Sequence, residues 1–134
     1  MEYLIGVGLA LSISVMARIV GLDRDRAFYP TVTMVVALLY GLFAIMGGSM
    51  PALGRESVGM AAFFLLAIIG FRFNLWLVAA ALFGHGVYDF FHGHLVSNPG
   101  VPVWWPAFCM TYDITAAGYL AWLLRTSKVA AKVS

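Results

Sequence analysis

Apolar residues along this chain are gathered into five long segments, and polar residues are concentrated in the short stretches between them. The apolar segments cover residues 1–20, 28–46, 57–71, 75–95 and 106–124. Apolar runs with few charges are typical of membrane-crossing helices, which need about 20 consecutive residues. The pattern therefore predicts an all-α fold, an integral membrane bundle of five transmembrane helices.

The third apolar segment is shorter than the others. The stretch from Gly47 to Glu56 is interpreted as a loop because it is rich in turn residues, which leaves only residues 57–71 for the helix. A helix of this length crosses a bilayer only if it recruits flanking residues or thins the membrane. The alternative fold is a bundle of four spans plus a re-entrant segment.

The positions of the basic residues distinguish these two topologies. With five spans, one side of the membrane receives every basic residue except Arg55, namely Arg18, Arg24, Arg26, Arg72, Arg125, Lys128 and Lys132. With four spans, the numbers of basic residues on the two sides of the membrane are more nearly equal. Cytoplasmic loops carry an excess of Lys and Arg, so the five-span topology is favoured, with the N-terminus outside and the C-terminus in the cytoplasm.

The composition agrees with a membrane location and limits the chemistry. The chain has 134 residues, of which 63% are hydrophobic and 10% charged, whereas soluble domains carry about 25% charged residues. This length predicts a single transmembrane helical domain over residues 1–134. The basic residues are scattered, which argues against nucleic acid as a partner. Cys109 is the single cysteine, so a thiolate-rich site is excluded, and it is interpreted as a small buried apolar residue.

The candidate chemistry lies in residues 85–94, which contain all three histidines of the chain. His85, Asp89 and His92 share one face of a helix, because positions i, i+4 and i+7 repeat at the helical period. Ionisable side chains inside a membrane helix are costly and indicate a functional site by default. This face of the fourth predicted span is therefore the candidate site.

A second span is expected to contribute to the same site. Asp113 lies in the fifth predicted span, at a depth similar to Asp89 if the two spans are antiparallel neighbours. Imidazole and carboxylate groups are suitable ligands for zinc, iron or manganese. The sequence therefore predicts a divalent-metal site that faces the outer end of the bundle. Its predicted ligands are His85, Asp89, His92 and Asp113, with His94, expected just past the helix end, as an optional fifth.

One prediction for the activity follows from such a site. The metal would activate water for hydrolysis of a membrane lipid or another amphiphile, with Asp89 or Asp113 as the catalytic general base.

Three other interpretations stay open. The cluster can be a buried hydrogen-bonded network that ties two spans together, or part of a proton or ion pathway. From a different class, the chain can be a non-catalytic accessory subunit of a larger membrane complex. Small-residue faces such as Gly6, Ala10 and Ser14 suit close packing against other helices, so other membrane-protein subunits or a homo-oligomer are candidate partners.

Three blocks of the sequence carry a family resemblance. The blocks GLDRDRAFYPTV, HGVYDFFH and NPGVPVWWPAFCMTYD resemble a small bacterial family of uncharacterised multi-span membrane proteins, a domain of unknown function. The resemblance implies a location in the bacterial inner membrane. It implies no activity and no catalytic residues.

Overall fold

The computed structural model describes residues 1–24 and 26–132, and this part of the chain forms helices and turns but no strand. The five helices are α1 (Glu2–Val20), α2 (Phe28–Met46), α3 (Met50–Phe73), α4 (Leu75–Leu95) and α5 (Trp105–Arg125). The predicted all-α fold with five helices is confirmed. α2 and α4 have the predicted bounds, and α1 and α5 differ from the prediction by at most one residue at either end.

The third helix is longer than predicted. α3 begins at Met50 and has 24 residues, so the loop predicted between Gly47 and Glu56 is wrong over most of its length. Ser49 is the N-cap, and its side chain accepts a hydrogen bond from the backbone N–H of Ala52 at 3.2 Å. Proline at the next-but-one position is tolerated because the first amides of a helix have no intrahelical partner. Residues that favour turns therefore also start this helix.

Three of the described helices, α1, α2 and α3, are long and apolar enough to cross a membrane. α4 and α5 have 21 residues each, and their apolar runs are interrupted by the ionisable residues of the candidate site. On the outer faces of α1 and α3, Leu4, Ile19 and Val58 are each 74% exposed. Exposed apolar side chains on these helices are suited to contact with lipid or with another membrane protein.

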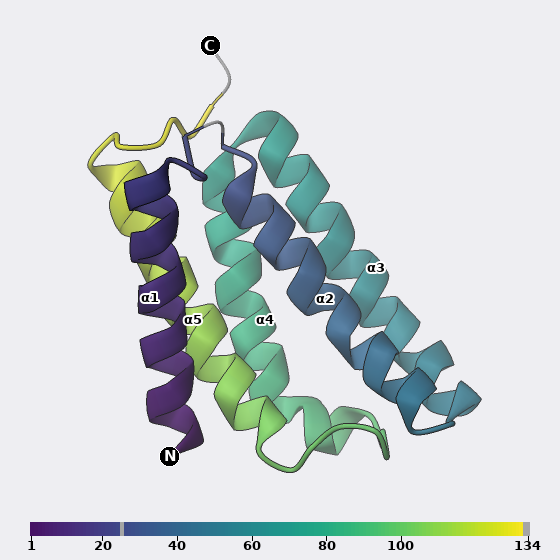
Figure 1. The fold of residues 1–134 in the computed structure, drawn as a ribbon. Coiled ribbons are helices and arrows are strands. Elements are labelled where there is room, and N and C mark those ends of the chain that lie inside the picture. The colour runs from purple at the N-terminus through teal and green to yellow at the C-terminus, as the bar shows by residue number, and fades with distance from the viewer. Residues whose placement is uncertain (25, 133–134) are drawn as a thin grey trace.

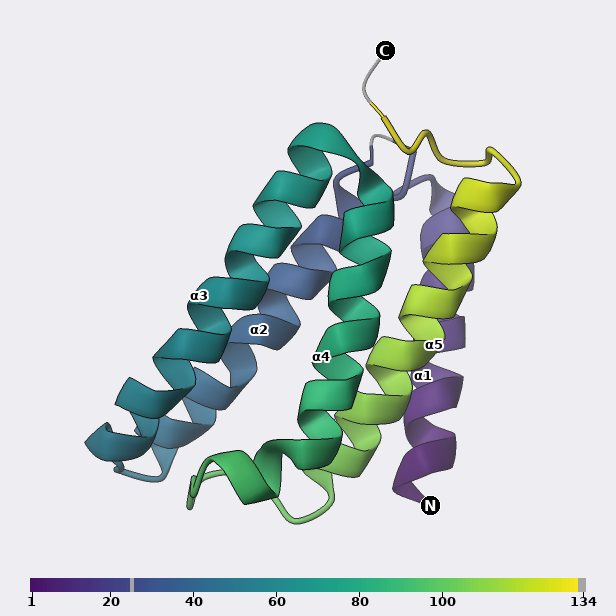
Figure 2. The same cartoon turned by 180° about the vertical axis from the view of Figure 1, so that it is seen from behind.

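The helices form two pairs that are joined by α4. α1 packs against α5, α2 packs against α3, and α4 contacts α5, α3 and α2 (Figure 1). Seen from behind, α4 lies in the middle, antiparallel to α5 as predicted (Figure 2). The α2–α3 pair leans away from α1 toward the end of the bundle where the N-terminus lies (Figure 1). The ionisable residues of α4 thus stand where the two pairs meet.

The contact between α1 and α5 depends on small residues, as the sequence predicts. Gly6, Ala10 and Ser14 are buried on one face of α1. A side chain at Gly6 would overlap the hydroxyl of Thr111 and the carbonyl oxygen of Phe108. The absence of a side chain at this position therefore allows the two helix backbones to approach closely.

The apolar core and the candidate site occupy different levels of the bundle. The core lies at the end of the bundle where α4 begins and α5 ends. It includes Leu75, Val78 and Leu82 of α4 with Leu120 and Leu123 of α5, all fully buried. The histidines of α4 follow these residues, toward the opposite end. Between helices in a membrane, close packing of side chains supplies the attraction, so these buried contacts hold α4 and α5 together beneath the site.

The polar loop between α1 and α2 closes the C-terminal end of the bundle. The Arg26 guanidinium donates hydrogen bonds to the carbonyl oxygens of Ala130, Ala131 and Phe71, at 2.8, 2.9 and 3.0 Å. Asp23 is buried and lies 3.3 Å from Arg18. This loop therefore joins α1 and α3 to the C-terminal segment.

Candidate functional site

Four side chains from α4 and α5 form a buried polar cluster, which we call the inner cluster: His85, Asp89, Cys109 and Asp113. His85 Nδ1 lies 2.7 Å from Asp113 Oδ2, a hydrogen bond between the two helices. The same nitrogen lies 3.5 Å from Asp89 Oδ2. The Cys109 thiol approaches Asp113 Oδ2 at 3.5 Å. Each helix supplies two residues one turn apart, which is why the four side chains converge.

The inner cluster has more acceptor oxygens than donors. Asp89 Oδ2 and Asp113 Oδ1 are buried and have no hydrogen-bond partner in the described part of the chain. Both aspartates are 0% exposed, so solvent does not satisfy these oxygens at the surface. A buried carboxylate without compensating partners is strongly unfavourable. The arrangement is therefore incomplete as a hydrogen-bonded network.

A cation would complete the inner cluster. One ligand atom from each of the four residues can be chosen so that all of them lie within 4.8 Å of one another. In a tetrahedral zinc site with bonds of about 2.0–2.3 Å, the ligand atoms lie about 3.3–3.8 Å apart, so the most distant pair here must approach by about 1 Å. Small side-chain movements suffice to bring the four ligands to one ion.

Tyr40 of α2 connects the inner cluster to the next turn of α4. Its hydroxyl donates a hydrogen bond to Asp89 Oδ1 at 2.7 Å. Its ring stacks on the imidazole of His92, with ring centroids 3.8 Å apart and an interplanar angle of 7°. Tyr40 therefore fixes the orientation of Asp89 and supports His92 with the same side chain.

His92 belongs to a second group, which we call the outer cluster: Glu56, Tyr88, His92 and Asn98. His92 Nε2 lies 2.7 Å from Glu56 Oε2. Asn98 Nδ2 donates to the same oxygen at 2.8 Å, and the Tyr88 hydroxyl donates to Glu56 Oε1 at 3.2 Å. Both carboxylate oxygens of Glu56 thus have partners. This cluster joins α3, α4 and the loop after α4.

The loop between α4 and α5 is held over the outer cluster. The Asn98 side chain also donates to the carbonyl oxygen of Tyr40 at 3.0 Å and accepts from the backbone N–H of Gly100 at 3.1 Å. At Gly100 a side chain would collide with the backbone carbonyl of Phe43. Glycine at this position allows the loop to lie directly against the end of α2.

The structure brings together three of the predicted metal ligands, His85, Asp89 and Asp113. His92 instead pairs with Glu56, because α3 extends far enough to place that carboxylate beside it. His94 was expected just past the helix end although the predicted span reached Leu95; α4 does reach Leu95, and His94 is an exposed residue of its last turn. These two histidines lie outside the inner cluster.

The cluster members Cys109 and Glu56, and Tyr40, which connects the two clusters, are among the residues that the sequence did not identify as part of the site. Cys109 precedes Asp113 by one turn on α5, so helical spacing alone would have placed the two side chains on one face. Glu56 follows the Ser49 cap on the same buried face of α3 as Ala52. Recognising that cap would have shown that Glu56 is helical. Tyr40 carried no such signal, because one tyrosine in an apolar helix has many possible partners.

Comparisons with known protein families, with curated proteins and with solved structures found no match. The resemblance of three sequence blocks to a bacterial membrane family therefore stays a prediction. The function has to be argued from the two clusters themselves.

Proposed function

We propose that the protein is a metal-binding membrane protein and that the inner cluster holds one divalent cation. The observation that carries the proposal is the pair of buried carboxylate oxygens without partners, Asp89 Oδ2 and Asp113 Oδ1, beside an imidazole and a thiol. Two carboxylates bring negative charge that a divalent cation would balance. The same cation would occupy the free lone pairs that the hydrogen-bonded arrangement leaves unused.

The ligand types favour zinc or iron over harder ions. A set of one imidazole, two carboxylates and one thiol contains both nitrogen and sulfur donors, whereas magnesium and calcium prefer oxygen ligands alone. Manganese is compatible with the imidazole and carboxylates but gains less from Cys109. We therefore rank zinc and iron before manganese.

The membrane topology is part of the proposal. All basic residues other than Arg55 lie at or beyond the helix ends that meet where the C-terminus lies (Figure 1). This distribution supports five crossings, with that end in the cytoplasm and the N-terminus outside. The bacterial inner membrane is proposed from the resemblance of the three sequence blocks alone. Reporter fusions to the two termini test the topology. A cytoplasmic signal from both termini would contradict the five-span topology.

Elemental analysis of freshly purified protein tests the metal. We expect close to one zinc or iron per chain in the wild type. His85→Ala should lose the metal because the imidazole is the only nitrogen ligand of the inner cluster, while His94→Ala, an exposed control on the same helix, should keep it. Absence of metal from the wild type, with no uptake of added zinc, iron or manganese, would refute the proposal.

Hydrolysis of a lipid or amphiphile is a second candidate function, and one observation favours it. Cys109 belongs to the inner cluster and also lines an apolar groove on the surface of the bundle. If His85, Asp89 and Asp113 are the protein ligands, the remaining position around the metal faces Cys109 and the groove. A metal with an open position activates water for hydrolysis. Turnover of a lipid ester by the metal-loaded protein but not by Asp113→Asn is the expected result.

A third candidate function is that of a non-catalytic accessory subunit of a larger membrane complex. The apolar outer faces of α1 and α3 would then contact other membrane-protein subunits or a second copy of the chain. Purification in a mild detergent separates these outcomes. Stoichiometric recovery with another membrane protein would favour the subunit, and recovery of the chain alone would count against it.

A further inference from the structure

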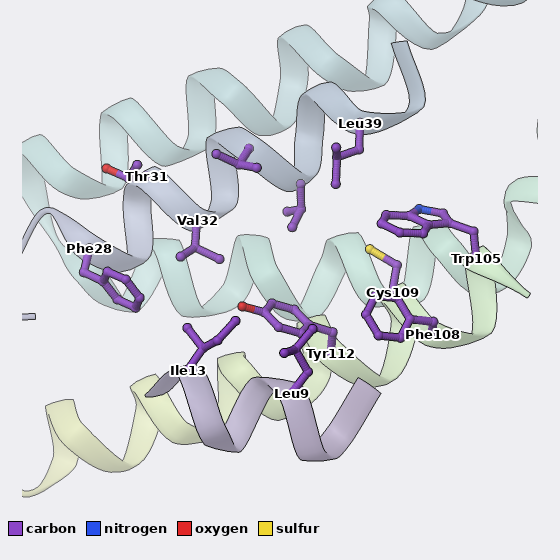
Figure 3. A pocket seen from close by; sticks show the side chains of 12 residues that line it. Leu9, Ile13, Phe28, Thr31, Val32, Leu39, Trp105, Phe108, Cys109 and Tyr112 are labelled. Atoms are coloured by element: carbon purple, nitrogen blue, oxygen red, sulfur yellow. The ribbon is translucent and has the colours of Figure 1, made fainter. Parts of the chain in front are cut away.

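The groove beside Cys109 is bounded by α1, α2 and α5 and runs along the bundle (Figure 3). On α2 its lining extends from Phe28 to Leu39, a distance of about 16 Å at 1.5 Å per residue. Its volume is about 330 Å³, at the lower end of the roughly 300–1,000 Å³ that is typical of ligand pockets. The groove is therefore long and narrow, with its axis along the helices.

The lining of the groove is almost entirely apolar. Val32 and Leu39 of α2 face Leu9 and Ile13 of α1 across it (Figure 3). The hydroxyl of Thr31 donates to the carbonyl oxygen of its own helix, at Ala27, over 2.8 Å, so it offers no free donor. The Tyr112 hydroxyl points into the groove (Figure 3), but one hydroxyl cannot replace the hydration that a charged ligand would lose here.

The groove opens sideways onto the apolar surface of the bundle. Val35 and Leu9, which line it, are 52% and 41% exposed. Both lie in helices that are apolar enough to cross a membrane, so the opening faces the region where lipid chains would lie. A flexible hydrocarbon chain parallel to the helices fits both the shape and the direction of the groove.

One end of the groove offers a polar contact. Trp105 lies there, beside Leu39 and Cys109 (Figure 3). The indole Nε1 of Trp105 is buried and has no hydrogen-bond partner among the described residues. A buried indole N–H normally has an acceptor. A small rotation of the indole would bring this N–H to the groove, where the carbonyl oxygen of a lipid ester would supply the acceptor next to Cys109.

We infer that this groove binds one acyl chain of a membrane glycerophospholipid, with the ester carbonyl at Trp105 and the hydrocarbon chain directed along α2 toward Phe28. The inference rests on the membrane location proposed above but not on the metal. If the hydrolase candidate is correct, this lipid is positioned as its substrate, because the ester end lies beside Cys109.

Native mass spectrometry can test this inference on the full chain in nanodiscs made of a single phosphatidylethanolamine species. After release into detergent, the wild type should retain one phospholipid per chain. Val32→Trp fills the middle of the groove and should lose it. Val58→Trp, a matched change on the exposed face of α3, should retain it. Trp105→Phe, which removes the N–H but keeps the ring shape, should weaken retention.

Three results would overturn the inference: no retained phospholipid in the wild type, equal retention in Val32→Trp, or a second copy of the chain in place of lipid. Metal content is measured on the same samples. The Val32→Trp variant should keep its metal, because Val32 is not a member of the inner cluster. Lipid retention without metal would refute the metal site and leave the groove assignment intact.

Discussion

The two histidine–carboxylate pairs on α4 are built from the same residue types, about two helical turns apart, and differ in how fully their oxygens are satisfied. In the outer cluster, three donors surround the Glu56 carboxylate, and both of its oxygens have partners. In the inner cluster, one imidazole faces two carboxylates, and each carboxylate keeps one oxygen that has no partner in the part of the chain that the structure describes. The outer cluster is complete as a structural network, while the inner cluster leaves a place for a further ligand.

This difference shows that the residue type alone does not identify a binding site in a membrane protein. A buried histidine next to a carboxylate is equally compatible with a clamp between helices and with a metal ligand. The balance of donors and acceptors around it distinguishes the two. Substitutions that change one cluster at a time can test whether unpartnered carboxylate oxygens mark a metal site and fully partnered ones a structural contact.

The largest difference between the clusters is expected for Asp89→Asn against Glu56→Gln. Both changes keep the side-chain shape and remove one negative charge. Asp89→Asn should lose the metal while the protein is still purified, because the amide is a poor ligand and the Tyr40 hydroxyl can still donate to its oxygen. Glu56→Gln should keep full metal content by elemental analysis. Metal retention in Asp89→Asn would remove the central residue from the proposed site.

Truncation of a side chain in the outer cluster should lower the stability of the fold and leave the metal content unchanged. Glu56→Ala leaves His92, Asn98 and Tyr88 without their shared acceptor. Leaving buried donors without their acceptor costs about 1–3 kcal/mol. Thermal unfolding in detergent should show a clearly lower midpoint for Glu56→Ala than for the wild type. An unchanged midpoint would mean that the outer cluster does not hold α3 against α4.

Tyr40→Phe should affect the inner cluster more than the outer one. It removes the hydrogen bond to Asp89 Oδ1 and keeps the ring that stacks on His92. Loss of a partner to a buried group costs about 1–3 kcal/mol, and loss of a group that orients a metal ligand typically weakens metal affinity about 10- to 100-fold. Competition with a metal chelator measures this change. Wild-type affinity in Tyr40→Phe would show that Asp89 needs no support from α2.

The smallest effect is expected at the third histidine. His94 is exposed in the last turn of α4, outside both clusters. His94→Ala should leave metal content and the unfolding midpoint unchanged within error. A loss of metal in this variant would show that the ligand set extends to the helix end, as the sequence pattern allowed.

The amino-acid sequence by itself determined the helices and much of their packing. The apolar runs place α2 and α4 with their observed bounds, because a run of apolar residues between polar turns has few other structures available. The same holds for the small-residue face at Gly6, Ala10 and Ser14, which is buried as predicted. The third helix was misjudged because Ser49 and Pro51 are residues of turns as well as of helix starts.

Only the tertiary structure decided which carboxylate each histidine meets. His85, Asp89 and His92 lie on one stripe of α4, and helical spacing treats them as equivalent. Their partners come from other helices: Asp113 and Cys109 from α5, Tyr40 from α2 and Glu56 from α3. Spacing along one helix gives the direction of a side chain, but the neighbour in that direction depends on how the helices pack. For this reason the stripe divides into one cluster whose carboxylate oxygens all have partners and one in which two oxygens have none among the described residues.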